Sequence, residues 1–383
     1  MQIPFHRPSL DEVAIGSVAS CLAGRWLTTG ARVREFEQGL AAYTRSRHVV
    51  AVNSGTAALH LALVALGVEA GDEVVVPTTT FAATAEVAIY LGATPVLADV
   101  DSGSACLSVD HAAAARSERT RVVMPVHLAG YPCDLDGLLP WAASRHIRVL
   151  EDAAHCLPAV FDGVQAVGRG DATALSFYAT KNITTGEGGA LLTGDAALAE
   201  RVRRLSLHGI SKDAWKRYTS EGTWRYDIIE PGFKYNLTDI AAALGLAQLA
   251  RSDEFHDRRR AIAARYSEAF ARVDGLAAPP DHPHHAWHLY ILRVGDGSTS
   301  EVRDEMIERV KAMGIGTSVH FIPLHMHSYY RDRFGYQPGD FPNALALFNR
   351  SLSLPLYPAL TDDEVDRVIE SVTGVARELF GSV

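Results

Sequence analysis

The chain has 383 residues, of which 48% are hydrophobic, and a formal net charge of −9. This length is typical of two domains, and the apolar content suffices for large cores, which excludes a disordered chain. The negative charge, without a dense run of Lys or Arg, argues against nucleic acid or an acidic membrane as a partner. We therefore expect a small-molecule ligand.

Cysteine usage and the N-terminal residues both indicate a cytoplasmic protein. Cys21, Cys106, Cys133 and Cys156 lack the spacing of zinc sites or disulfide frameworks, so we expect reduced, mostly buried thiols. The first residues do not show the charged and then apolar layout of a signal peptide. No apolar run approaches the ~18 residues of a membrane span.

The first predicted helix covers residues 8–24 and ends at Gly24. Its apolar residues recur at helical spacing and are Leu10, Val13, Ala14, Val18, Cys21 and Leu22. The segment Trp26-Leu-Thr-Thr-Gly30 follows as a turn, which by itself is compatible with an ordinary loop between helices.

From about residue 48 the chain alternates short β-branched runs with helical patterns. The predicted strands are Val49–Val52, Glu73–Val76, Thr94–Ala98, Arg121–Pro125, Arg148–Leu150, Ala172–Ser176 and Ala190–Leu192. Helical patterns between them include Ala57–Leu66, Ala82–Leu91 and Asp136–His146. This alternation predicts an α/β fold with a mainly parallel sheet and helices on both faces, whose ligands bind at the carboxyl ends of the strands.

Three motifs fall at such strand ends. Ser54, Gly55 and Thr56 start a helix after a strand, where free backbone N–H groups bind a phosphate well. Asp152 ends an apolar run, and a carboxylate there can keep the pyridine nitrogen of pyridoxal phosphate (PLP) protonated. Lys181 lies in a polar turn between two apolar runs, and a lysine amine forms a Schiff base with a carbonyl cofactor such as PLP. Each motif alone is compatible with a helix cap, a capped strand or a surface lysine, but in this order all three match one cofactor.

The C-terminal part has a different pattern. Thr238–Leu249 is a predicted Ala-rich helix, and Arg251–Val273 is a longer helix that we expect to bridge two domains, with the basic run at 257–260 on a solvated face. Predicted strands at Tyr290–Val294 and Thr317–Phe321 flank a helix at Ser300–Met313, and a last helix covers Asp362–Leu379. We predict a large domain over residues 1–250 and a small α+β domain over residues 251–383. Four histidines at 282–288 raise the question of zinc, but no carboxylate or cysteine completes a ligand set, so we expect no metal.

The motifs together resemble the DegT/DnrJ/EryC1/StrS family of fold-type I, PLP-dependent sugar aminotransferases, from Pro4 to about the last twenty residues. Within that family the chain is similar to enzymes that aminate C4 of UDP-linked 4-keto sugars, such as the UDP-4-amino-4-deoxy-L-arabinose aminotransferases. The stretches that carry the resemblance are Trp26-Leu-Thr-Thr-Gly30, Ser54-Gly-Thr-Ala-Ala58, Glu151-Asp-Ala-Ala-His155, Lys181-Asn-Ile-Thr, Gly232-Phe-Lys-Tyr-Asn-Leu-Thr-Asp239 and His285-Ala-Trp-His288.

The resemblance implies further cofactor contacts. Phe81 corresponds to an aromatic ring that stacks on PLP, and His155 to the residue at the 3′-oxygen of the cofactor ring. Ser176 corresponds to a serine that donates to the phosphate. Asn236 corresponds to an asparagine that reaches the phosphate from the other subunit, which implies a homodimer with shared active sites.

It also implies where the substrate lies. The turn with Trp26 and Thr28 is expected near the substrate mouth, and His320 resembles a family histidine near the substrate. The charged and aromatic segment 211–218 is typical of a surface loop. Alternatively, Lys212 and Tyr218 contact the diphosphate and base of a nucleotide sugar, because a lysine suits phosphate and an aromatic ring stacks on a base.

The expected reaction is ping-pong transfer of an amino group from L-glutamate to the keto carbon of the sugar. Lys181 holds the cofactor and then moves a proton as a base, while Asp152 keeps the ring an electron sink. Lysine at position 181 disfavours the dehydratases of the family, which carry histidine there. A 3-keto-sugar or inosose aminotransferase stays open as an alternative, as does a non-catalytic ligand-binding regulator on the same fold, although a pure binder has no need of the Lys181 and Asp152 pair. The sugar, its nucleotide and the pathway stay open.

Overall fold

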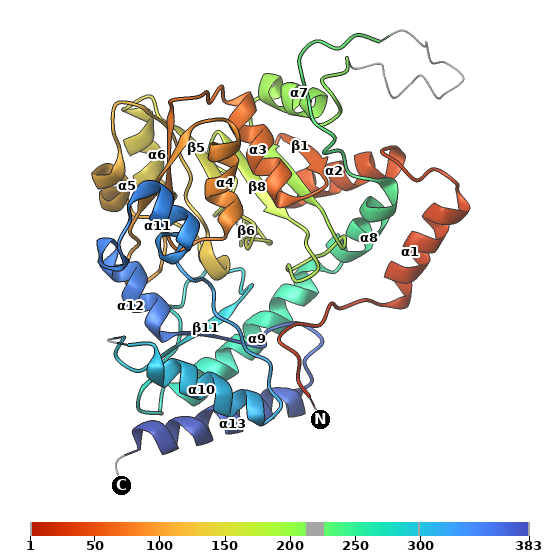
Figure 1. Cartoon of the computed structure of the whole chain (residues 1–383). Helices are drawn as coiled ribbons and strands as arrows, with labels where there is room; N and C mark the ends of the chain where they lie inside the picture. The colour runs from red at the N-terminus through yellow and green to blue at the C-terminus, as the bar shows by residue number, and fades with distance from the viewer. Residues whose placement is uncertain (1, 212–225, 298, 382–383) are drawn as a thin grey trace.

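The computed structural model describes residues 2–211, 226–297 and 299–381, and its centre is a seven-stranded sheet (Figure 1). The strands are β1 (His48–Val52), β2 (Glu73–Pro77), β3 (Thr94–Ala98), β4 (Thr120–Val123), β5 (Arg148–Asp152), β8 (Ala172–Ser176) and β9 (Gly189–Thr193). Their order is β1-β9-β8-β5-β4-β2-β3. Only β9 runs antiparallel to its neighbours, and the pairs from β8 to β3 are parallel. The predicted α/β fold with a mainly parallel sheet is confirmed.

Helices cover both faces of this sheet, as the unbroken apolar strands predict. They are α2 (Ala31–Thr44), α3 (Gly55–Ala65), α4 (Ala82–Tyr90), α5 (Val109–Ala115), α6 (Leu135–Ala143), α7 (Ala196–Leu205) and α8 (Asp239–Leu249). Side chains of β2 alternate between the two faces: Val74 and Val76 pack with α3 and α4, whereas Val75 packs with α5 and α6.

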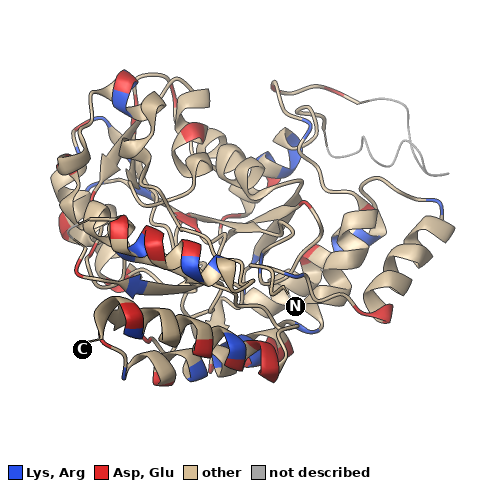
Figure 2. Ribbon diagram, turned by 60° about the horizontal axis from the view of Figure 1, so that its bottom comes forward, with Lys and Arg blue, Asp and Glu red and all other residues tan. Residues whose placement is uncertain are grey.

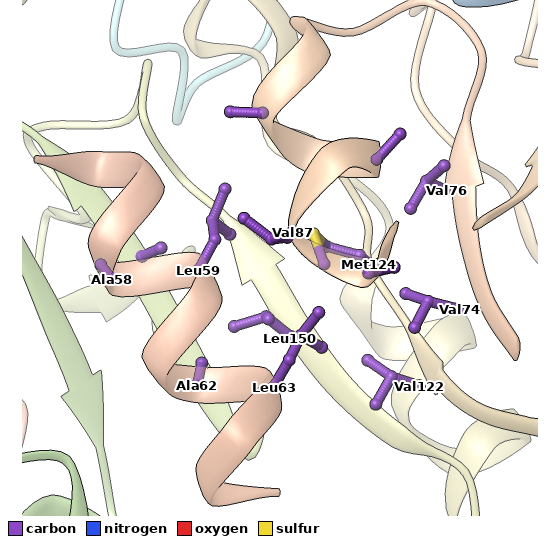
Figure 3. Packing of buried hydrophobic residues seen from close by; sticks show 14 of the residues in the cluster. Ala58, Leu59, Ala62, Leu63, Val74, Val76, Val87, Val122, Met124 and Leu150 are labelled. Atoms are coloured by element: carbon purple, nitrogen blue, oxygen red, sulfur yellow. The ribbon is translucent and has the colours of Figure 1, made fainter. Parts of the chain in front are cut away.

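Helix α3 lies in the middle of one layer, and all its side chains from Ala57 to Leu63 are buried. Figure 3 shows Leu59 and Leu63 of α3 directed toward the strands, where they meet Leu150 of β5 and Val87 of α4. A helix that is apolar on all sides is stable only inside such a core. Burial of each leucine contributes about 1.5–3 kcal/mol to stability. The N-terminus of α3 is therefore held firmly at the carboxyl ends of the strands.

A second cluster of buried apolar residues lies in the C-terminal part, beside the N-terminus of the chain (Figure 1). It is formed by a three-stranded antiparallel sheet of β10 (Leu276–Ala277), β11 (Tyr290–Val294) and β12 (Ser351–Leu354) and by helices α9 (Ser252–Phe270), α10 (Glu301–Ala312) and α13 (Asp362–Phe380). Ile3 joins this cluster through a parallel bridge to Ile315. The predicted strand Thr317–Phe321 is wrong: after a single bridge at Ser318, the chain leaves the sheet and His320 and Phe321 line a cavity.

Helix α9 packs into the second cluster through Tyr266 and, at its start, into a third apolar cluster with Phe36 of α2 through Phe255. The prediction that its basic run is a solvated face is wrong for Arg259, which is 1% exposed. The guanidinium of Arg259 donates from Nη1 to the backbone carbonyls of Trp287, His288 and Leu356. Burial lowers its pKa from 12.5 to about 9.

The remaining elements are α1 (Glu12–Ala23), α11 (Ser328–Phe334), α12 (Pro342–Arg350), the short strands β6 (Val160–Phe161) and β7 (Val164–Gln165), and the 3-10 turns η1 (Leu128–Gly130), η3 (Leu324–Met326) and η4 (Pro338–Asp340). Tyr330 of α11 and Leu347 of α12 pack in the cluster of α3 and α4 although they come late in the chain. The division into domains at residue 250 stays a prediction.

Helix α1 packs on α8, but much of its apolar stripe does not face a core. Leu10, Val13 and Leu22 are each at least half exposed, and only Ala14 and Cys21 of the helix are buried. The predicted helix is therefore present, whereas the described residues do not bury its apolar stripe as the spacing implies.

The surface carries charges of both signs, and Figure 2 shows Lys and Arg interspersed with Asp and Glu along the outer helices. In the part of the chain that is described, no helix is long and apolar enough to cross a membrane. Cys21, Cys106, Cys133 and Cys156 are buried free thiols, as expected.

Candidate active site

A cavity of about 400 Å³ lies at the carboxyl ends of β1, β2, β5 and β8. The predicted site residues that line it are Ser54, Gly55, Thr56, Phe81, Asp152, His155, Ser176, Lys181 and His320. They come from segments far apart in the sequence, and they meet because parallel strands present their carboxyl ends at one edge of the sheet.

The N-terminus of α3 forms one wall of the cavity. The hydroxyl of Ser54 caps the helix by accepting from the N–H of Ala57 at 3.0 Å. A Cβ atom on Gly55 would lie 2.9 Å from the Cβ of Ser176, so only glycine lets the helix start this close to β8. The first N–H groups of a helix have no partner within it and carry its positive dipole end. This wall is therefore suited to a phosphate, with the hydroxyl groups of Thr56 and Ser176 beside it.

Asp152 is the last residue of β5 and is 6% exposed. Its Oδ2 accepts a hydrogen bond of 2.8 Å from the hydroxyl of Thr84, and its Oδ1 accepts one of 3.2 Å from the N–H of Ala154. The hydroxyl of Thr84 also lies 2.7 Å from that of Thr80. These contacts hold the carboxylate in one orientation. Sequence reasoning missed Thr84, because a threonine in the first turn of a helix carries no distinctive signal.

Lys181 lies in a turn after β8, where its N–H donates to the carbonyl of Tyr178 at 2.9 Å. Burial lowers the pKa of its side chain from 10.5 to about 8, and the negative charge of Asp152 acts in the opposite direction. Because a neutral amine is the nucleophilic form, this lysine is available for attack on a carbonyl group near neutral pH.

Three of the histidines that line the cavity, His155, His288 and His320, lie close enough to Lys181 for its charge to affect their pKa. Burial lowers the pKa of His155 and of His288 well below 6.5, and that of His320 to about 4, and the charge of Lys181 adds to each shift. All three are therefore neutral at neutral pH. His288 is part of a motif noted in the sequence, but its place in the cavity was missed.

The N-terminal segment supplies two further lining residues that sequence reasoning missed, Phe5 and His6. The ring of Phe5 stacks on that of His320 with centroids 5.5 Å apart. Nothing in the sequence signals these contacts, since they depend on the pairing of Ile3 with the distant Ile315. Phe81 is 62% exposed at the start of α4, with its ring 6.0 Å from that of Phe321.

Three other predicted site residues that the structure describes do not line this cavity. Trp26, Thr28 and Asn236 line a separate groove of about 1230 Å³, together with Arg203 and Lys234. The side-chain amide of Asn236 donates to the hydroxyl of Thr29 at 2.7 Å and accepts from the amine of Lys234 at 2.5 Å. Lys212 and Tyr218 lie outside the described residues. The roles predicted for all of these residues stay predictions.

Within the described residues, no group of three or more His, Cys, Asp or Glu is arranged to hold a metal ion. Of the histidines between 282 and 288, His285 instead stacks on Trp287 with ring centroids 3.9 Å apart and accepts from the N–H of Trp287. An amine, a fixed carboxylate and an anion-binding helix end in one cavity fit the phosphorylated pyridine aldehyde predicted from the sequence.

Comparison with known proteins identifies the family of the chain. The model of the DegT/DnrJ/EryC1/StrS aminotransferase family matches residues 8–373. The spore coat polysaccharide biosynthesis protein SpsC of Bacillus subtilis (strain 168) is 48% identical over 378 residues, covering 98% of this chain and 97% of SpsC.

Two solved structures are similar over nearly the whole chain. The PLP-form of Spr1654 from Streptococcus pneumoniae, described as a sugar aminotransferase, superposes with a TM-score of 0.91 at 34% identity, covering 99% of this chain and 100% of that one. The aminotransferase TlmJ from Streptoalloteichus hindustanus has a TM-score of 0.90 at 34% identity, with 98% and 99% covered.

Proposed function

The chain belongs to the DegT/DnrJ/EryC1/StrS aminotransferase family, and we propose that it moves an amino group from L-glutamate to the C4 keto carbon of a nucleotide-linked sugar. Amino transfer to a sugar and the use of PLP follow from family membership. The donor, the nucleotide and the carbon are the proposed part. The observation that carries the proposal is one cavity with Lys181, Asp152 and the N-terminus of α3.

Bound PLP supplies a ring that stabilises negative charge on the carbon next to the transferred nitrogen. In this chain, Asp152 is the group to hold the proton on the ring nitrogen. The N–H groups at the start of α3 and the hydroxyl groups of Ser54, Thr56 and Ser176 would hold the phosphate of PLP. Lys181 would bind the carbonyl group of the cofactor through its neutral amine.

Lys181 also serves as the base. Its pKa of about 8 lets Nζ accept a proton from the donor carbon and return it later to the sugar, without a large energetic penalty in either direction. The Nδ1 atom of His155 accepts from the N–H of Ala129 at 3.2 Å, so its proton is on Nε2 and is available to an oxygen in the cavity.

Three observations support the finer proposals. The sequence motifs resemble those of C4 enzymes that act on UDP-linked sugars. The named role of the relative SpsC in polysaccharide biosynthesis supports a product destined for a polysaccharide. A cytoplasmic location accords with the supply of nucleotide sugars there and with the four buried free thiols.

We further propose a homodimer with shared sites. The groove with Trp26 and Asn236 and the exposed apolar residues of α1, such as Val13 at 69%, are surfaces that a second copy covers. In that arrangement Asn236 of one copy reaches the phosphate in the other. The groove also holds Arg203 and Lys234, which suit an anionic ligand.

Absorption spectroscopy tests the proposal. The purified protein is mixed with PLP, then with L-glutamate, and then with a UDP-linked 4-keto sugar. We expect a visible band that is lost with glutamate, returns with the sugar, and is absent in Lys181→Ala. Lys311→Ala, an exposed lysine of α10 paired with Glu308, is the matched control and should behave as the wild type.

The outcomes separate the alternatives. Return of the band with a 3-keto sugar or an inosose, but not with the 4-keto sugar, transfers the assignment to that substrate. A wild type without any band that depends on Lys181 contradicts the proposal and favours a ligand-binding regulator.

A further inference from the structure

His155 and His288 stand side by side in the cavity, with ring centroids 4.3 Å apart and ring planes 37° apart. Both are buried, and both line the space next to Lys181. In a neutral histidine one ring nitrogen donates and the other accepts, and the hydrogen bonds made outside the cavity determine which is which.

The tautomer of His288 follows from Asn182. The Nδ2 atom of Asn182 donates to the carbonyls of Leu157 at 2.6 Å and Ala286 at 2.9 Å, which fixes the orientation of the amide. Its Oδ1 therefore faces Nδ1 of His288 at 2.9 Å as an acceptor, and the proton of His288 must be on Nδ1. The Nε2 atom of His288 carries a lone pair.

His155 has the opposite tautomer, because the backbone N–H of Ala129 donates to its Nδ1. The two neighbouring rings thus offer one N–H and one lone pair at their Nε2 atoms. No hydrogen-bond partner of either Nε2 occurs among the residues that the structure describes, so both atoms are available to a ligand.

The position of His288 is fixed on its backbone as well. The guanidinium of Arg259 donates to the carbonyl of His288 at 3.1 Å and to that of Leu356 at 2.7 Å. The side chain is held by Asn182, and the residue lies two positions before β11 of the C-terminal sheet. A group held this firmly loses little entropy when it binds a ligand.

We propose that Nε2 of His288 accepts a hydrogen bond from the hydroxyl group next to the reacting ketone of the sugar, and that His288 is thereby a specificity-determining residue. This inference rests on the proposed function and names the substrate feature that the same site recognises.

The chemistry of the two substrates favours the hydroxyl group. A lone pair repels the carboxylate oxygens of an amino acid donor, whereas every hydroxyl group of a sugar can donate to it. The low pKa of His288 makes it a weak base, so it contributes little to removing a proton from an ammonium group. A neutral acceptor at neutral pH suits a neutral donor.

The test compares two sugars in the PLP-loaded protein: a UDP-linked 4-keto sugar with its C3 hydroxyl group, and the 3-deoxy analogue. The variants are His288→Phe, which has no lone pair, and His288→Gln, which keeps one donor for Asn182 and one acceptor for the cavity. The glutamate and sugar half-reactions are followed separately by absorption. For each protein the result is the ratio of kcat/KM for the two sugars. Because both values come from the same protein, this ratio does not depend on the fraction of active protein.

We expect the wild type to prefer the hydroxylated sugar in kcat/KM by on the order of 10- to 100-fold. In His288→Phe the ratio should fall to about 1–3, in His288→Gln it should stay near the wild-type ratio, and the glutamate half-reaction should change less than about threefold. Calorimetry with the PLP-free proteins should show the same effect: the ratio of Kd values for the amino-sugar product and its 3-deoxy analogue should fall in His288→Phe.

Other results overturn the inference. If His288→Phe keeps the wild-type ratio, His288 does not bind the hydroxyl group. If the variant also slows both half-reactions equally, His288 affects Lys181 or the stability of the fold instead. A wild type that converts both sugars equally well overturns the inference and leaves the proposed function intact. A wild type that converts neither sugar overturns both.

Discussion

The hydroxyl of Thr84 in α4 donates a hydrogen bond of 2.8 Å to Oδ2 of Asp152 at the end of β5. The carboxylate that we propose faces the cofactor is thus oriented by a helix that follows a different strand. Replacement by valine keeps the shape and removes the donor. We expect Thr84→Val to slow amino transfer about 10-fold, because a displaced catalytic group loses much of its effect.

Thr84→Ser is the matched control, since serine retains the hydroxyl group, and its turnover should stay within about threefold of the wild type. Steady-state rates with both substrates check the pair. Equal rates in the valine and serine variants would show that the hydrogen bond has no role.

The pKa of Lys181 has a consequence for stability. Burial lowers it from 10.5 to about 8, so the folded protein releases this proton at a lower pH than the unfolded chain. Below pH 8 the buried charge therefore destabilises the PLP-free protein, by at most about 3 kcal/mol, and the penalty disappears as the pH rises from about 8 to 10.5. Lys181→Met removes the charge.

We expect PLP-free Lys181→Met to have a higher Tm than the PLP-free wild type at pH 7, with a difference that narrows between pH 8 and 10.5. Thermal unfolding followed by circular dichroism measures it. A variant that is less stable than the wild type at pH 7 would contradict the prediction.

Glu151, next to Asp152 on β5, is fully buried and connects this strand to neighbouring segments through hydrogen bonds. It accepts from Nε2 of His127 at 3.0 Å and from the N–H groups of Gly168, Arg169 and Gly170 at 2.9, 2.6 and 2.5 Å. Removal of a buried charge partner with several donors costs about 3–5 kcal/mol. We therefore expect Glu151→Ala to unfold at a much lower urea concentration than the wild type. The unfolding midpoint of Glu151→Gln should lie between those of the other two proteins.

The contribution of Glu151 depends on pH. Burial raises its pKa, but the hydrogen bonds from His127 and from the 168–170 loop outweigh this and bring it below 4.5. The stabilisation is fully present above pH 4.5 and is lost as the pH falls through the lower pKa of the folded state. The difference in stability between wild type and Glu151→Gln should thus shrink below pH 4.5, and a constant difference would argue against an ionised Glu151.

The proposed dimer predicts complementation between two inactive variants. Lys181→Ala lacks the amine, and Asn236→Ala lacks the group that reaches across the interface. If sites are shared, a mixed dimer has one site with both residues intact. We expect co-purified mixed dimers to recover about a quarter to a half of wild-type activity per dimer, whereas each variant alone stays inactive.

Two differently tagged subunits allow the mixed dimer to be isolated, and light scattering gives its mass. Mixed dimers without activity, or a monomeric wild type, would refute the shared site.

Much of the site could be predicted from the sequence, because its main groups lie at strand ends. Apolar runs followed by Ser54, Asp152 and Lys181 indicate buried strands that end in polar groups, and the topology of parallel strands brings such ends to one edge. Local patterns also predicted the seven strands of the main sheet to within about two residues.

Only the tertiary structure decided how the other groups are used. Arg259 belongs to a basic run typical of a solvated face, yet it is buried because backbone carbonyls from two distant loops accept hydrogen bonds from its guanidinium. The stripe on α1 has helical spacing but stays exposed at Val13, since none of the residues that the structure describes covers it. Spacing reports periodicity within one element and carries no information on what packs against that element.

The difference between the tautomers of His155 and His288 also depends on contacts between distant segments. Their residue type and the apolar segments around them were visible in the sequence, which by itself determined the family, the cofactor and the order of the site. The proton on each ring depends on Ala129 in one case and on Asn182 in the other. A tautomer is determined by the partner across space, and that partner exists only once the chain has folded.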